Sequence, residues 1–145
     1  LMAANKIDEA RNYLLKASAL FPDNITYLAG LVETEIAAGN NAEAQKLLDQ
    51  FEKSKQNEAG LLYLQGMLHA AEGKAPEAFD FYQQSWKSKP TELAADAIYK
   101  HYLAQNNKAQ AKSFVAEWLE KFPQSYRASL LKALDAQDKN DIHVA

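Results

Sequence analysis

A small apolar residue recurs along the chain with a constant period. Alanines preceded by glutamate or glutamine are spaced 34, 34 and 33 residues apart. Four and seven residues after each of them come further apolar or small side chains, which is the spacing of one helix face. Such a stripe is typical of a helix that packs into a core rather than of a cofactor site. The recurring alanines are Ala10, Ala44, Ala78 and Ala111.

Residues that end helices keep the same phase. Glycine or asparagine, which tolerate left-handed backbone at a helix end, precedes each alanine by five residues and appears once more near residue 140. Proline, which cannot continue a helix, follows three of the alanines by twelve residues. The glycines and asparagines are Asn5, Gly39, Gly73, Asn106 and Asn140, the prolines are Pro22, Pro90 and Pro123, and Gln56 stands where a fourth proline would fall.

These recurring helix-ending residues predict pairs of helices joined by tight turns, with no strand. We expect first helices over 25–38, 58–72, 91–105 and 124–138, and second helices over 8–21, 41–55, 75–89 and 108–122. Pro76 falls in the first turn of its helix, where a missing N–H costs nothing. The alanines allow the two helices of each pair to approach closely.

Composition agrees with a helical chain and excludes several classes of protein. The 145 residues include 26 alanines and 18 leucines, which favour helices. The net charge is −3 and arginine occurs only at Arg11 and Arg127, so a nucleic-acid surface is not expected. No cysteine is present, which excludes disulfides and thiolate metal sites. The sequence shows neither an apolar run of membrane-spanning length nor a signal peptide at its start.

A 34-residue helix–turn–helix unit with a recurring alanine, a glycine or asparagine turn and a terminal proline resembles the tetratricopeptide repeat (TPR). The resemblance covers essentially the whole chain, although single units depart from the family pattern; its inner-helix glycine, for example, is matched only by Gly66. It implies an α-solenoid of stacked antiparallel hairpins wound into a right-handed superhelix. We expect a partial repeat over 1–24, repeats over 25–58, 59–91 and 92–125, and a partial repeat over 126–145. Because the repeat phase is cut within a helix pair at both ends and Leu130, Leu131 and Leu134 do not read as a polar cap, we expect a piece of a longer array.

The resemblance implies a non-catalytic scaffold that binds a protein or peptide in the concave groove lined by first helices. Much of this groove is apolar, which suits a partner helix or an extended segment. The alternative is that the same face packs against further repeats or a second copy of the chain, and self-association through the truncated ends is a further expectation. The groove residues inferred by analogy are Glu33, Tyr63, Leu64, Met67, Asp96, Lys100, Arg127, Leu130, Leu131 and Leu134.

No catalytic motif, cofactor site or metal site emerges from the sequence. It has no phosphate-binding glycine loop and no nucleophile elbow. His69 and Glu72 lie at i and i+3 on one helix, but without further ligands we interpret His69 as a packing residue. We therefore expect neither an enzyme, nor a cofactor, nor a bound metal.

Three other functions are weaker hypotheses. A carboxylate clamp like that of chaperone-binding TPR proteins is disfavoured, because only Lys100 and Arg127 could contribute to it. Binding of single-stranded RNA is disfavoured by the acidic balance of charge. The composition also resembles bacterial TPR proteins of exopolysaccharide export and protein sorting (PEP-CTERM). That would favour a periplasmic or outer-membrane-associated lipoprotein, with the periplasm preferred over the cytoplasm.

Overall fold

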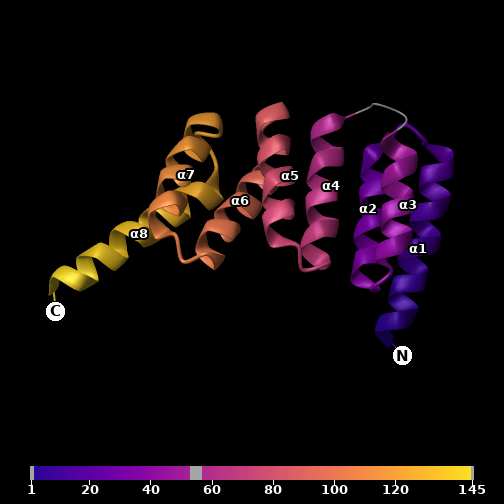
Figure 1. Cartoon of the computed structure of the whole chain (residues 1–145), viewed down its shortest axis with the longest axis horizontal. Helices are drawn as coiled ribbons and strands as arrows, with labels where there is room; N and C mark the ends of the chain where they lie inside the picture. Colours follow the sequence, from indigo (N-terminus) through magenta and orange to yellow (C-terminus); the bar gives the residue numbers. More distant parts are fainter. Residues whose placement is uncertain (1, 53–56, 145) are drawn as a thin grey trace. The chain divides into compact units, whose positions relative to one another are not determined.

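The computed structural model describes residues 2–52 and 57–144, and within these ranges every regular element is an α-helix (Figure 1). The predicted all-α fold of antiparallel helix hairpins is confirmed. In chain order the helices are α1 (Met2–Leu20), α2 (Ile25–Ala37), α3 (Asn41–Glu52), α4 (Glu58–Ala71), α5 (Ala75–Ser88), α6 (Glu92–Ala104), α7 (Lys108–Lys121) and α8 (Tyr126–Val144).

The ends of most helices agree with the bounds predicted from the sequence. Helices α2, α4, α5, α6 and α7 begin and end within one residue of their expected bounds. Pro22, Pro90 and Pro123 each stand two residues beyond the end of a helix, and Pro76 lies in the first turn of α5. The end expected for α3 and the stop at Gln56 lie outside the described residues. The division into repeats stays a prediction.

Three of the turns share one geometry. Gly39, Gly73 and Asn106 have φ of 78°, 77° and 55°, as expected for left-handed residues. Each donates its N–H to the carbonyl three residues earlier, and the next residue donates to the carbonyl five residues earlier. These bonds satisfy carbonyl groups that the helix end leaves free. Asn57, which caps α4, is also left-handed at φ 53°, and the sequence pattern did not predict it.

The turns expected at Asn5 and Asn140 are absent, because α1 and α8 run through these residues. Asparagine tolerates left-handed backbone but does not require it. A helix reverses where a second helix can pack against it, and only a few described residues lie beyond each of these asparagines. Continuing the helix keeps its backbone hydrogen bonds, so these two predictions were wrong.

The chain divides into two compact units, each with its own core. Unit 1 comprises Leu1–Lys89 with α1 to α5, and unit 2 comprises Pro90–Ala145 with α6 to α8. Within each unit, successive helices pack on one another. The two tryptophans are divided between the units, with Trp86 buried in unit 1 and Trp118 buried in unit 2. In unit 1, one buried cluster joins α2, α3 and α4 through Val32, Ala44, Leu48, Leu64 and Leu68.

The predicted alanine anchors are buried in three of four cases. Ala44, Ala78 and Ala111 are almost fully buried, as expected for closely packed helix pairs. Ala10, however, is exposed. Helix α1 meets α2 through another part of its surface, which includes Leu14 against Gly30. No described helix covers the side of α1 that carries Ala10.

Candidate functional site

Three of the residues predicted for the groove form one charged cluster in unit 2. Asp96 and Lys100 lie one turn apart on α6, and Arg127 lies near the start of α8. The Lys100 Nζ is 2.7 Å from the Asp96 Oδ2, and the Arg127 Nη2 is 3.0 Å from the Asp96 Oδ1. The Arg127 Nε also donates to the Asp96 Oδ1, at 3.1 Å. The cluster therefore ties the two first helices of unit 2 together.

The charges of this cluster are accessible to water. Burial raises the pKa of the Asp96 carboxyl, but hydrogen bonds from Lys100 and Arg127 and their positive charge outweigh it and hold the pKa below its ordinary value. Asp96 is therefore ionised at neutral pH. One anion faces two cations, so the cluster keeps a net positive charge. The Lys100 and Arg127 side chains are 64% and 45% exposed to solvent.

Exposed leucines surround the charged cluster. Leu93 and Leu103 lie on α6 at the helical spacing of Asp96 and Lys100, and Leu130 and Leu134 share a side of α8 with Arg127. All four side chains are exposed. We call these residues the α6/α8 face, which comprises Leu93, Asp96, Lys100, Leu103, Arg127, Leu130 and Leu134.

A cavity of about 390 Å³ adjoins this face. Its lining joins α6, α7 and α8, and it includes Leu103 and Leu134 of the α6/α8 face together with Leu131. Charged side chains stand around the apolar part, among them Lys112 and Asp135, which form an ion pair of 3.6 Å. An apolar hollow with charged edges suits a side chain or helix turn of a binding partner.

Two of the leucines predicted for the groove are instead buried. Leu64 belongs to the core cluster of unit 1, packed with Val32 and Leu48, so its assignment to an open groove was wrong. Leu131 is also buried. One period separates Gly30 from Leu64, and Gly30 packs against α1. The position shared by Gly30 and Leu64 therefore lies about 100° around the helix from the neighbouring position that lines the predicted groove. It faces the second helix of the preceding pair.

The other unit 1 residues of the predicted groove do not form an open apolar surface. Tyr63 and Met67 of α4 are half-buried: the Tyr63 ring centroid lies 5.6 Å from that of Tyr82, and Met67 packs on the core cluster. Burial and the nearby Tyr63 raise the pKa of Tyr82 to about 12. Glu33 is exposed on α2. Of the predicted residues, the structure therefore brings Asp96, Lys100 and Arg127 into contact in unit 2, with exposed leucines on the same helices.

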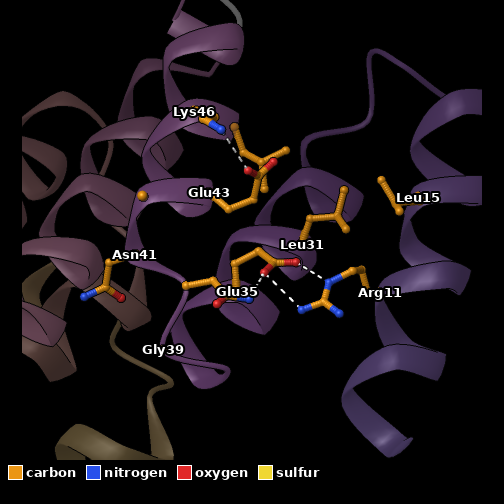
Figure 2. A pocket seen from close by; sticks show the side chains of 11 residues that line it. Arg11, Leu15, Leu31, Glu35, Gly39, Asn41, Glu43 and Lys46 are labelled. Atoms are coloured by element: carbon orange, nitrogen blue, oxygen red, sulfur yellow. Dashed lines mark hydrogen bonds and ion pairs between the residues drawn. The ribbon is translucent and has the colours of Figure 1, made fainter. Parts of the chain in front are cut away.

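Sequence reasoning missed an ion pair in unit 1 (Figure 2). Arg11 of α1 donates from Nε to the Glu35 Oε1 at 2.5 Å and from Nη2 to the Glu35 Oε2 at 3.1 Å. Asn40 donates to the same carboxylate at 2.9 Å. The Arg11 Nη1 donates to the Asp8 Oδ1 at 2.6 Å. The available signal was a pair of carboxylates, Glu33 and Glu35, in the largely apolar helix α2, together with one of only two arginines.

This ion pair stands at the wall of an open cleft of about 690 Å³. The cleft is lined by α1, α2 and the start of α3, and it includes Leu15, Leu31 and Lys46 (Figure 2). Hydrogen bonds from Arg11 and Asn40 hold the pKa of Glu35 below its ordinary value, although burial opposes them. Arg11 and Glu35 neutralise one another and join α1 to α2, while the second anion of the cluster, Asp8, is exposed to solvent.

His69 packs as the sequence predicted. Its ring centroid lies 4.9 Å from that of Phe81 on α5, and its Nδ1 is 2.8 Å from the Gln65 carbonyl oxygen. Among the side chains that the structure describes, no group of three potential metal ligands comes together. No helix in the described part of the chain is long and apolar enough to cross a membrane.

Comparisons with known proteins agree with the helix pairs. Residues 1–68 match a family model described as tetratricopeptide repeat. A thermophilic TPR protein of Thermus thermophilus has a similar structure, with a TM-score of 0.73 and 19% identity over 91% of this chain and 74% of that one. At this identity the likeness shows the fold alone.

A second solved structure, the APC/C hetero-tetramer Cut9–Hcn1, contains a chain that is 17% identical. The match covers 91% of this chain and 40% of that one, and its TM-score of 0.29 is too low to carry an argument. Among curated proteins, none matches the sequence.

Proposed function

Residues 1–68 match the tetratricopeptide repeat family and the chain has the fold of a TPR protein, and on this premise we propose that it is a non-catalytic scaffold that binds a protein segment on the α6/α8 face of unit 2. The TPR fold supports a role in protein interactions in general. The single observation that carries the choice of face is the set of exposed leucines around the cluster of Asp96, Lys100 and Arg127.

The apolar part of this face accounts for affinity. Leu134 is 48% exposed and lines the 390 Å³ cavity together with Leu103. Covering a large apolar side chain contributes roughly 1.5–3 kcal/mol, so a few leucines are enough for a specific complex. The partner segment therefore presents apolar side chains at helical or extended spacing.

The charged part of the face selects the partner's charge and orientation. The cluster has a net positive charge, with Lys100 and Arg127 both reachable from solvent. A carboxylate on the partner can accept hydrogen bonds from these cations without displacing Asp96. Such exposed charges influence the rate of association and the orientation more than the affinity. We therefore expect an apolar segment that carries at least one acidic residue.

Peptides selected from a random displayed library on the immobilised 145-residue chain provide the probe. Their affinity for the unmodified chain and for Leu134→Asp is then measured by isothermal titration calorimetry. We expect Leu134→Asp to weaken binding at least about tenfold, because a buried leucine contact is replaced by a charge that must lose its hydration. Selected peptides should be rich in apolar residues and carry a net negative charge.

Leu15→Asp is the matched control. Leu15 is also 48% exposed, but it lies on α1 beside the cleft of unit 1. This variant should bind the selected peptides like the unmodified chain. Equal loss of binding in both variants, or unchanged binding by a folded Leu134→Asp variant, would contradict the proposed face.

A further inference from the structure

The cleft of unit 1 lies at a place that two other helix pairs close with rings of their own. The repeat period puts Glu35 of α2 and Leu47 of α3 where each of these pairs has two ring-bearing side chains, and both residues line the cleft of about 690 Å³. Among the described residues that line the cleft, none is aromatic. The rings that close the other pairs, with centroids 4.9 and 6.4 Å apart, belong to His69 with Phe81 and to Tyr102 with Phe114.

The walls of this cleft are apolar at positions that are polar one repeat later. Leu15 of α1 and Leu31 of α2 line the cleft. One period further along the chain, their positions are occupied by Asp49 and Gln65. The cleft therefore combines an unfilled ring position with apolar walls, and both features set it apart from the equivalent place between α3, α4 and α5.

The Arg11 guanidinium in the wall of the cleft is already engaged along its edges (Figure 2). Its Nε and Nη2 atoms donate to Glu35 and its Nη1 atom donates to Asp8, and such hydrogen bonds lie in the plane of the group. A carboxylate ligand would be repelled by the two carboxylates bound there. An aromatic ring, in contrast, stacks on the flat face of a guanidinium without displacing either of them.

The charges at the cleft favour a basic ligand. Two ion-paired groups stand there: Arg11 with Glu35 and Asp8, and Lys46 with Glu43. Three anions therefore face two cations, and the two outer anions are open to solvent, with Asp8 64% and Glu43 52% exposed. The α6/α8 face has a net positive charge instead, so the two surfaces attract ligands of opposite charge.

We propose that the cleft of unit 1 binds an aromatic side chain of a basic protein segment. The bound ring packs on Leu15, Leu31 and the face of Arg11, and it takes the place that the chain's own rings fill in the other two helix pairs. Lysine or arginine residues beside it face Asp8 and Glu43. This site goes beyond the proposed partner of the α6/α8 face and does not depend on it.

Peptides selected from a random displayed library on the Leu134→Asp variant of the 145-residue chain provide the probe, because this substitution blocks the α6/α8 face. Their affinity for the unmodified chain is measured by isothermal titration calorimetry. We expect peptides in which an aromatic residue stands beside lysine or arginine, and binding that weakens as the salt concentration rises. Replacing the aromatic residue of the peptide with alanine should weaken binding at least about tenfold.

Leu47→Phe is the decisive variant, because it closes the cleft from within. The new ring stands where α5 and α7 have a phenylalanine, so the helix content should be retained and peptide affinity should fall at least about tenfold. Arg11→Lys keeps a cation beside Glu35 but has no flat face, and it should bind about threefold more weakly or worse. Leu20→Asp is the control on α1: Leu20 is 74% exposed and lies outside the cleft lining, so binding should be unchanged.

Three results would overturn the proposal. The selection yields acidic or purely aliphatic peptides, a Leu47→Phe chain of full helix content binds the peptides as strongly as the unmodified chain, or Leu20→Asp loses as much affinity as Leu47→Phe. Circular dichroism measures the helix content of every variant. If Leu47→Phe loses helix content, undiminished binding by a folded Arg11→Lys variant overturns the proposal in its place.

Discussion

The two units place their interhelical charges differently. In unit 1 the Glu35 side chain is only 4% exposed and is fully engaged by Arg11 and Asn40. In unit 2 Asp96 joins α6 to α8 in a similar way, but the cations that hold it face solvent. A buried pair fixes how two helices meet, whereas an exposed pair does so weakly and stays available to a ligand.

The apolar residues of the first helices show the same contrast. Leu64 and Met67 of α4 are drawn into the core of unit 1, while Leu93, Leu130 and Leu134 of unit 2 stay exposed. Met67 and Leu134 are equivalent positions of the repeated motif, and the one in unit 2 is exposed, whereas Leu64 and its equivalent Leu131 are buried in both units. This difference is what directs the proposed binding to the α6/α8 face.

The largest expected effect comes from overfilling a covered helix contact. Ala78→Leu should lower the free energy of unfolding by about 1–3 kcal/mol, because Ala78 is buried and its carbonyl lies close to Gly66. Ala10→Leu, at the equivalent but exposed position, should change it by less than about 0.5 kcal/mol. Chemical denaturation of both variants measures the difference, and equal effects would mean that Ala10 is covered in solution.

Removing each arginine compares the two ion pairs directly. Arg11→Met should lower the melting temperature by several degrees, because it leaves the buried Glu35 carboxylate without its cation. Arg127→Met should lower it little, because Asp96 keeps Lys100 and partial access to water. Thermal melts followed by circular dichroism provide the measurement. A larger loss in the Arg127 variant would reverse the assignment of structural and binding roles.

The shared turn geometry provides a third comparison. Gly73→Ala should cost about 1–2 kcal/mol, since φ of 77° is strained for a residue with a Cβ. Asn106→Gly, at the equivalent turn of unit 2, relieves such strain and should be neutral or slightly stabilising. Urea titrations of the two variants test this. A neutral Gly73→Ala variant would indicate that this turn relaxes to another conformation.

Acid should lower the free energy of unfolding of both units, by less than the substitutions above. The pKa values of Glu35 and Asp96 are held below their ordinary values in the folded chain. Each therefore contributes stability that is full above the unfolded pKa of about 4 and is lost as the pH falls through the folded pKa. Glu35→Gln should flatten the acid limb of a plot of stability against pH. An unchanged limb would mean that Glu35 titrates alike in both states.

Features that depend on a few neighbouring residues were predictable from the sequence. The turns at Gly39, Gly73 and Asn106 follow from backbone freedom at single positions, and the prolines end helices wherever they stand. Three of the four alanine anchors were also predictable, because a small residue that recurs in phase with the turns has a packing reason. Local rules failed at Asn5 and Asn140, where no helix pair forms around the asparagine.

Features that depend on distant parts of the chain were not predictable in the same way. Arg11 and Glu35 lie 24 residues apart, and their pairing depends on how α1 crosses α2. The burial of Leu64 was missed because a register error of one residue turns a side chain by about 100° around the helix. For Asp96 and Arg127, analogy with a repeat family placed the residues on one surface, but not in contact.

The division of the two tryptophans gives each unit its own fluorophore. Trp86 and Trp118 are both shielded from water in the folded chain, so unfolding of either unit shifts the emission of its own indole. Trp118→Phe leaves a reporter of unit 1 alone, and Trp86→Phe leaves a reporter of unit 2 alone. Denaturation curves of the two single-tryptophan chains coincide if the helical array unfolds in one step, and they separate if its two halves melt independently.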